Sequence, residues 1–289
     1  MKQHADEWPI EEMARVLGVS RSGYYKYRKR TPGKYKAENE ILLKVIKSIY
    51  ERSRQTYGSP RIHAELIQQG FNCSRKRVAR LMKKAGIAAK MKRAFKRTTQ
   101  VDSRRKAAPN LLQQEFSATM PNLKWAGDIS YIGTKEGWLY IAVILDLFSR
   151  KVVGLAMSES MHTALIIKAL EQALARRRPS GELQHHSDRG CQYTSEAFQA
   201  LLDKHGIVCS MSGTGNCYDN AVVESFFHTL KTECVYFENY ATREQAMKSI
   251  FEYVERFYNN QRRHSTLGYV TPAEFERRFY QQPHLAVST

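Results

Sequence analysis

The sequence predicts an α/β protein in which a mixed sheet flanked by helices follows an all-helical, strongly basic region. Three observations support this prediction. Positive charge is concentrated in residues 1–124, two helix-turn-helix patterns lie in that same part, and from residue 124 onward short β-branched and aromatic segments alternate with helical periodicity. A chain of 289 residues has room for two or three domains.

The composition argues against several broad classes of protein. Apolar residues make up 42% of the chain, so general disorder is not expected. The five cysteines lack the spacing of a zinc ribbon or a redox motif, which argues against a disulfide scaffold and a structural zinc site. The longest apolar run, residues 139–145, is too short to span a membrane, and residues 1–7 lack the core of a secretion signal. We therefore expect a cytoplasmic protein with no membrane partner.

The net charge of +18 is distributed unevenly along the chain. Residues 1–124 hold 29 Lys and Arg against 10 Asp and Glu, whereas residues 125–289 hold 17 against 18. The densest stretch, residues 71–106, has 14 basic residues and one acid, Asp102. This asymmetry favours a polyanion as the partner of the N-terminal part, although an unusually basic solvated surface gives the same count.

The first helix-turn-helix pattern defines a short predicted segment, residues 1–32. Pro9 suits the first position of a helix, Gly18 can take the positive φ of a turn, and Ser20 can cap a second helix.

The second pattern spans residues 59–86, with one helix over 60–69, a turn, a cap at Ser74 and a second helix over 75–85. Apolar residues give that second helix a buried face and leave six cations toward water or phosphate: Arg75, Lys76, Arg77, Arg80, Lys83 and Lys84. An ordinary helical hairpin has the same periodicity, but six cations on one helix favour contact with DNA. Together with an irregular basic linker, the pattern forms a predicted DNA-binding domain, residues 33–105.

Residues 106–240 form the predicted α/β part. Strands are expected over residues 125–132, 138–145 and 151–157, which run antiparallel, and then over 183–187 and 207–211. Helices are expected over residues 162–178, 195–205 and 221–234, and one over 243–260 begins a helical extension of residues 241–289. Three antiparallel strands followed by alternating helices and strands make a mixed sheet with helices on its faces.

Three acids occur where a charge needs an explanation. Asp128 lies inside the first strand, Asp188 directly follows the fourth, and Glu224 lies one turn into a helix. Each alone has an ordinary interpretation as a cap or a surface residue. If they meet at the ends of adjacent strands they repel one another, and a divalent cation relieves that repulsion. Oxygen ligands favour Mg²⁺, with Mn²⁺ as a substitute, and two such ions would assist attack at a phosphodiester.

The surroundings of these acids resemble a known family. Asp188 and Glu224 are separated by 35 residues, which resembles the D-D-35-E pattern of retroviral integrases and insertion-sequence transposases. The matching segments are WAGDISYI around Asp128, HSDRGCQYTS around Asp188, SMSGTGNCYDNAVVESFFHTLKTE around Glu224, YNNQRRHSTLGYVTP near the end, and YGSPRI upstream. These segments extend over nearly the whole chain. The chain is therefore similar to the second-reading-frame protein of two-frame bacterial insertion elements.

The resemblance implies an RNase H-like catalytic core that depends on Mg²⁺. Residue by residue, Asp128, Asp188 and Glu224 match the family's metal-binding triad, and Lys231 matches its basic residue near the transferred DNA end. Residues 224 and 231 share one helix face, which agrees with that match, and a solvated lysine is the alternative. The terminal motif, with Arg262 and Arg263, is expected to be largely structural with some phosphate contact.

We therefore expect an insertion-sequence transposase of the DDE type, which cleaves and joins DNA strands at the element's terminal repeats. Its expected partners are double-stranded DNA, both terminal inverted repeats and target, and further copies of itself on that DNA. In the resembled family the active enzyme is commonly a fusion with an upstream frame, so an upstream-frame protein is another expected partner. A location at the nucleoid follows from these partners.

Two alternatives remain open at this point. A non-catalytic DNA-binding regulator could have kept the fold, but the intact triad argues against it. A plain RNase H-like nuclease would share the core, but the two helix-turn-helix patterns and the terminal motif argue against that.

Overall fold

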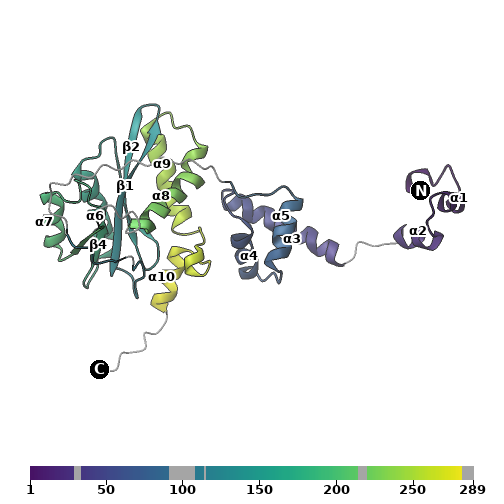
Figure 1. The fold of residues 1–289 in the computed structure, drawn as a ribbon, viewed down its shortest axis with the longest axis horizontal. Helices are drawn as coiled ribbons and strands as arrows, with labels where there is room; N and C mark the ends of the chain where they lie inside the picture. The colour runs from purple at the N-terminus through teal and green to yellow at the C-terminus, as the bar shows by residue number, and fades with distance from the viewer. Residues whose placement is uncertain (29–33, 91–107, 114, 214–219, 282–289) are drawn as a thin grey trace, which may run out of the picture.

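The computed structural model describes residues 1–28, 34–90, 108–113, 115–213 and 220–281 (Figure 1). Most of the predicted basic linker and most of the loop before residue 220 lie outside the described residues. At the N-terminus a 3-10 turn, η1 (Lys2–His4), precedes two short helices, α1 (Ile10–Val16) and α2 (Arg21–Arg28). The chain reverses at Gly18 with φ of 64°, and the Ser20 hydroxyl accepts the Gly23 N–H at 3.0 Å. The predicted turn and cap are confirmed, whereas Pro9 precedes the helix as its N-cap.

The next three helices pack together as the α3–α5 unit, residues 34–90: α3 (Lys34–Arg52), α4 (Ser59–Gln68) and α5 (Arg75–Lys84). The Ser74 hydroxyl caps α5 by accepting the Arg77 N–H at 3.2 Å, as predicted. The sequence interpretation missed α3. Its buried residues Leu42, Ile46 and Ile49 recur at helical spacing and pack in one hydrophobic cluster with α4 and α5.

Five strands form one mixed sheet in the order β3-β2-β1-β4-β5. They are β1 (Lys124–Thr134), β2 (Gly137–Asp146), β3 (Val152–Ser158), β4 (Gln184–Ser187) and β5 (Val208–Met211). β1, β2 and β3 pair antiparallel, and β4 and β5 run parallel to β1. All five strands lie within a residue or two of the predicted segments, and the predicted mixed sheet is confirmed.

Helices cover both faces of the sheet (Figure 1). α6 (Thr163–Arg177) and α7 (Glu196–Lys204) share a hydrophobic cluster with Ala142 and Ile144 of β2. α8 (Ala221–Glu233) and α9 (Arg243–Glu252) share another with Ile141 and Val143 of the same strand. Alternate residues of β2 thus face opposite layers, so the centre of the sheet is buried on both sides.

The C-terminal part adds short helical segments after α8. These are η3 (Val235–Phe237), the π-helical turn η4 (Tyr253–Tyr258) that continues α9, η5 (Ser265–Leu267) and α10 (Pro272–Gln281). The predicted helix over 243–260 therefore ends as a π-turn, in which Tyr253, Phe257 and Tyr258 are all buried. The boundaries predicted at residues 105/106 and 240/241 stay predictions.

A buried ion-pair network fastens α6 and α10 to the sheet edge. Arg177, at the end of α6, donates to Glu276 of α10 at 2.7 and 2.9 Å, to Asp146 of β2 at 3.2 Å and to the Asn122 side chain at 2.8 Å. Lys151 adds a bond to Glu276 at 3.1 Å. The Asp146 side chain is 0% exposed, and burial raises its pKa despite the bonds it accepts. The network holds two otherwise costly carboxylates inside the protein.

Candidate active site

The first candidate acid lies on the central part of the sheet. Asp128 is in β1, paired with Val143 of β2, and its side chain is half-buried. The Ile129 N–H donates to its Oδ1 at 2.7 Å. This bond ties the carboxylate to the backbone of a strand that is itself fixed by its ladder with β2.

The second acid is brought beside the first by parallel pairing. In the β1–β4 ladder Lys124 pairs with Gln184 and Ala126 with His186. Asp188 directly follows β4, two residues past the last pair of this ladder, and its charge acts on Asp128, so the two carboxylates lie close together. The Gly190 N–H donates to Asp188 Oδ1 at 2.9 Å and fixes that side chain in the turn after β4.

The pKa values of Asp128 and Asp188 are both raised. Burial, then the charge of Asp188 and, more weakly, that of Glu224 raise the pKa of Asp128 well above its usual range. The Ile129 N–H and Lys231 oppose the shift. Burial also raises the pKa of Asp188 against the hydrogen bond from Gly190. The two carboxylates are therefore unfavourable in their charged forms unless a cation lies beside them.

Helix α8 supplies the third acid and a cation. Glu224 is exposed in its first turn, and Asn220, at the N-cap, donates to the Gly127 carbonyl at 3.4 Å, which holds the start of α8 against β1. Lys231 is half-buried, with its Nζ 5.4 Å from the centre of the Tyr131 ring. Burial lowers the pKa of Lys231, and Asp128 opposes that shift. Lys231 thus lies over Tyr131 and near Asp128 instead of extending freely into solvent.

The carboxylates of this site are candidate ligands for a metal ion. Within the described ranges no group of three His, Cys, Asp or Glu side chains is placed so that it could hold an ion. Mg²⁺ is commonly bound by one or two carboxylates, with waters and substrate phosphates completing six oxygens. Asp128 of β1 and Asp188 after β4 are oxygen donors whose like charges repel on neighbouring central strands, so they fit that requirement, and Glu224 lies on the adjacent helix.

The sequence interpretation missed Gly127 and His185, which lie beside the acids. A Cβ added at Gly127 would lie 2.9 Å from His185 Nε2, so glycine there makes room for the buried imidazole next to Asp128. Burial lowers the pKa of His185 to about 3, which keeps it neutral. His186 points the other way and contacts the hydroxyls of Ser210 and Ser212, because adjacent residues on a strand face opposite sides of the sheet.

Comparison with known proteins then decides the family. Integrase core domain models match residues 118–217 and 224–279, and an HTH-like domain model matches residues 36–95. The transposase InsF of insertion sequence IS3A from Escherichia coli is 42% identical over 280 residues, 96% of this chain and 97% of that protein. The chain belongs to the family of IS3-type insertion-sequence transposases.

Two further similarities accompany this assignment. The 31 kDa protein of insertion element IS600 from Shigella sonnei is 44% identical over 93% of this chain and 99% of its own length. Among solved structures, the HTLV-2 integrase catalytic core domain in complex with magnesium covers 55% of this chain and 99% of that domain, with 18% identity and a TM-score of 0.44. The predicted insertion-sequence transposase with an integrase-type core is confirmed, and the chain is a DNA transposase.

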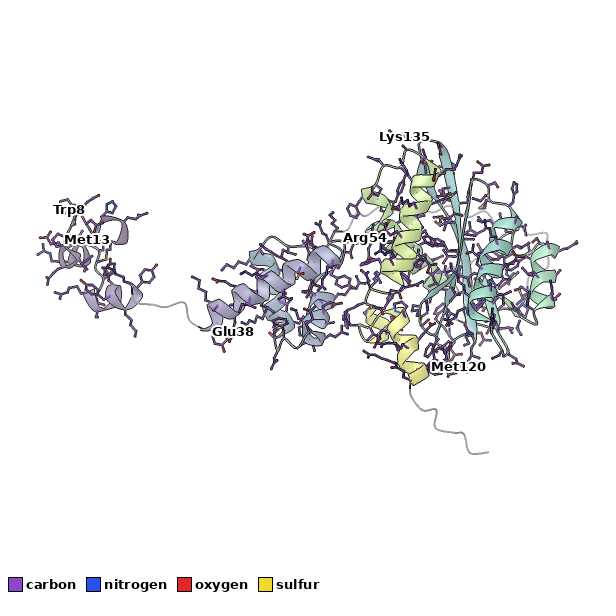
Figure 2. All side chains as sticks on the ribbon, turned by 180° about the vertical axis from the view of Figure 1, so that it is seen from behind. Trp8, Met13, Glu38, Arg54, Met120 and Lys135 are labelled. Atoms are coloured by element: carbon purple, nitrogen blue, oxygen red, sulfur yellow. The ribbon has the colours of Figure 1, made fainter. Side chains whose placement is uncertain are left out.

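The six predicted DNA-facing cations of α5 are exposed in this transposase, with the exception of Arg77. Five are exposed: Arg75, Lys76, Arg80, Lys83 and Lys84. Arg77 is turned toward α3, where its Nε donates to Asn39 at 2.8 Å and its Nη2 to Glu38 at 3.2 Å (Glu38 is labelled in Figure 2). Arg77 therefore braces α5 against α3, a pairing that no local sequence pattern indicates.

The two arginines of the transposase's terminal motif are buried. Arg262 pairs with Glu233, and Arg263 pairs with Glu65. The expectation that this motif is largely structural therefore agrees with the fold. Both guanidinium groups face protein partners.

No helix among the described residues is both long and apolar enough to cross a membrane.

Proposed function

We propose that Asp128, Asp188 and Glu224 bind two divalent cations, Mg²⁺ or Mn²⁺ in its place, and that this site cleaves and joins DNA at the element's terminal repeats. The observation that supports this most is the parallel β1–β4 pairing, which brings Asp188, at the carboxyl end of β4, near Asp128 of β1, with the start of α8 held against β1. The charge of Asp188 raises the pKa of Asp128, as expected for a site that needs positive charge.

The protein's own residues have distinct parts in this reaction. When bound, the ions would polarise the phosphodiester and lower the pKa of an attacking water or 3′-hydroxyl. Asp128 and Asp188 are held by the Ile129 and Gly190 N–H groups, so their oxygens need little rearrangement. Lys231 can hold a phosphate of the DNA end in line for attack. No covalent bond between protein and DNA is needed.

The DNA is bound by α5 in this proposal, with exposed cations on phosphates of the terminal repeats. Target DNA occupies the same active site for joining, which requires at least two copies of the chain on one complex, one for each end. An upstream-frame protein, fused or separate, supplies further contacts. Since every partner is DNA or bound to DNA, the transposase acts at the nucleoid in the cytoplasm.

The function is tested by a paired assay on one preparation, joining of labelled terminal DNA beside nicking of plasmid, in Mg²⁺ and in EDTA. Wild type is expected to do both in Mg²⁺ and neither in EDTA. Lys231→Ala should lower joining about tenfold or more and leave nicking nearly unchanged, because the carboxylates remain. Lys168→Ala, an exposed lysine on α6, is the control. Cleavage in EDTA would contradict the function, and unchanged joining by Lys231→Ala would contradict the role of that residue.

The α5 surface gives a separate prediction on binding. The triple variant Arg75→Ala, Arg80→Ala, Lys84→Ala should reduce the slope of log affinity against log salt by about 0.9 for each phosphate that the helix no longer neutralises. Fluorescence anisotropy with terminal DNA at several salt concentrations measures this. The control removes three exposed lysines of α6, α7 and α9, Lys168, Lys204 and Lys248, and so matches the change in charge. Equal slopes for the two triple variants would show that α5 does not bind the phosphates.

A further inference from the structure

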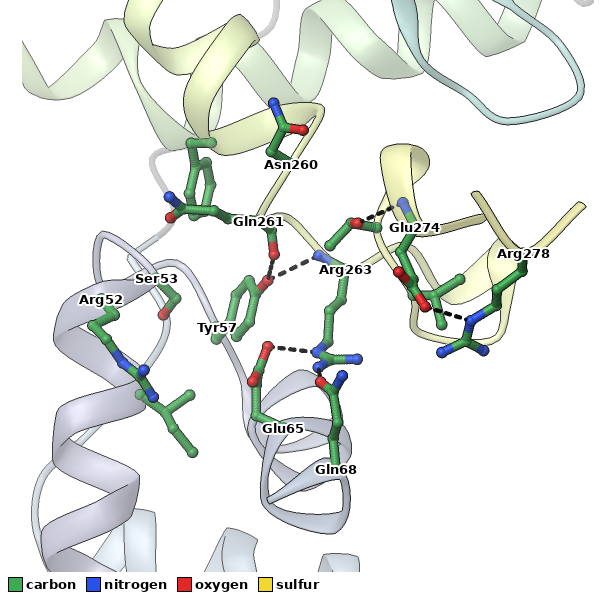
Figure 3. Close-up of a pocket in the computed structure, with 14 residues that line it drawn as sticks. Arg52, Ser53, Tyr57, Glu65, Gln68, Asn260, Gln261, Arg263, Glu274 and Arg278 are labelled. Atoms are coloured by element: carbon green, nitrogen blue, oxygen red, sulfur yellow. Dashed lines mark hydrogen bonds and ion pairs between the residues drawn. The ribbon is translucent and has the colours of Figure 1, made fainter. Parts of the chain in front are cut away.

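The α3–α5 unit is attached to the C-terminal part by hydrogen bonds centred on Tyr57 and Arg263 (Figure 3). The Tyr57 hydroxyl donates to the Gln261 carbonyl at 2.9 Å and accepts the Arg263 N–H at 2.8 Å. The Arg263 guanidinium donates to Glu65 of α4 at 2.6 Å and also to Gln68. Every one of these bonds crosses between segments about 200 residues apart in sequence.

A second set of contacts lies at the far end of α8. Glu233, the last residue of α8, accepts two bonds from Arg262, both at 2.8 Å, and one from the Tyr253 hydroxyl at 2.9 Å. Arg61 of α4 reaches the same carboxylate at 3.4 Å. Arg54, labelled in Figure 2, lies 5.7 Å from the centre of the Tyr253 ring and adds a contact between the same two parts.

The ion pair at the end of α8 is shielded from water, which makes that contact specific. The side chains of Arg262 and Glu233 are 6% and 8% exposed. Burial raises the pKa of Glu233, but hydrogen bonding and charge from Arg262, with help from Arg61, outweigh it and lower the pKa overall. A cavity of about 540 Å³ lies beside Tyr57 and Arg263, and the Tyr57 ring packs on Phe257 with the ring centres 6.4 Å apart, so directed bonds and apolar packing hold the two parts together here.

Helix α8 connects these contacts to the active site. Glu224 is in its first turn and Glu233 at its last, a separation of about 13 Å along one rigid helix. The α4 helix, which packs directly against α5, is therefore linked through Arg61 and Glu233 to the helix that carries Glu224. The distance from the basic helix to the catalytic acids depends on these contacts.

We propose that this interunit clamp, made of Tyr57, Arg61, Glu65, Glu233, Arg262 and Arg263, sets where the active site meets DNA held by α5. Its members are positioning residues: they fix the spacing between the bound sequence and the cleaved bond. This inference rests on the proposed function for the α5 surface and the acids. In this proposal Arg262 and Arg263 help to determine which bond is cleaved, and they do not bind phosphate.

The test uses the full chain and a charge-matched pair of double variants. Tyr57→Phe removes two hydrogen bonds across the interface, and Glu65→Gln removes the negative charge that pairs with Arg263. Tyr50→Phe with Glu51→Gln makes the same chemical changes inside the α3–α5 unit, where Tyr50 bonds to Ala88 and Glu51 to Gln55. Each variant is assayed for affinity to terminal DNA, for Mg²⁺-dependent nicking of plasmid, and for cleavage of terminal DNA mapped to the nucleotide.

The clamp variant is expected to match wild type in affinity and nicking, while cleavage at the correct nucleotide falls about tenfold or more and spreads to neighbouring positions. The control variant should match wild type in all three. Unchanged cleavage positions and rate in the clamp variant would overturn the proposal, as would an equal loss of nicking, which marks a general structural defect.

Small-angle X-ray scattering keeps this test separate from the proposed function. The clamp variant should give a broader distance distribution than wild type and the control, because the α3–α5 unit is less firmly held. An unchanged distribution would overturn the clamp whatever the activity. Failure of the proposed function shows differently, as a wild-type protein that cleaves no DNA in Mg²⁺.

Discussion

Asp128→Asn is expected to reduce Mg²⁺-dependent cleavage of terminal DNA by about 10³-fold or more and to leave DNA affinity within about twofold. The change keeps the shape of the side chain and removes a charge that neutralises the cations. Asp188→Asn and Glu224→Gln should have effects of the same kind, because the three acids act on the same ions. Single-turnover cleavage of labelled terminal DNA, beside anisotropy for binding, measures both quantities.

Matched substitutions elsewhere on the core give the control for these acids. Asp203→Asn and Glu196→Gln change exposed carboxylates of α7 and should leave cleavage unchanged. Strong Mg²⁺-dependent cleavage by any one of the three site variants would contradict the assignment of that residue.

Arg177→Met should lower the free energy of unfolding by about 3–5 kcal/mol. The methionine keeps an apolar stem of similar length but leaves Asp146 and Glu276 without their shared guanidinium, and both carboxylates are nearly inaccessible to water. Urea denaturation followed by tryptophan fluorescence reports the loss, and Trp125 is a buried probe in β1.

The neighbouring arginine provides the comparison. Arg176 pairs with Glu255 at 2.6 Å, but its side chain is 41% exposed. Since an exposed pair contributes about 0–1 kcal/mol, Arg176→Met should change stability little. Equal losses for the two variants would show that burial of the Arg177 network has no special effect.

Local patterns in the sequence predict most of the elements. The three antiparallel strands have β-branched and aromatic runs bounded by turns, and Ser74 has the capping position that the structure confirms. Asp128 is visible because a charge inside a strand is costly, whereas Asp188, directly after a strand, gains its meaning from its 35-residue separation from Glu224 and the motif around it. That they meet depends on the parallel β1–β4 register, a long-range pairing that no local spacing gives.

Other features depend on tertiary partners and could not be predicted in the same way. Arg77 has the helical position of a DNA-facing cation, but Glu38 and Asn39 of the missed helix α3 turn it inward. Arg262 and Arg263 belong to a motif expected to be largely structural with some phosphate contact, and only the fold shows that Glu233 and Glu65 are their partners. Gly127 is ordinary in sequence, and its role follows from the position of His185.

The central claim is that Asp128, Asp188 and Glu224 form one divalent-cation site, and anomalous scattering from Mn²⁺ tests it most directly. Crystals of the transposase with terminal DNA, grown in Mn²⁺, should show anomalous peaks in contact with the carboxylates of Asp128 and Asp188. Those peaks should be absent from Asp128→Asn crystals grown in the same way. A protein that cleaves DNA in Mn²⁺ but shows no peak at these carboxylates would contradict the account.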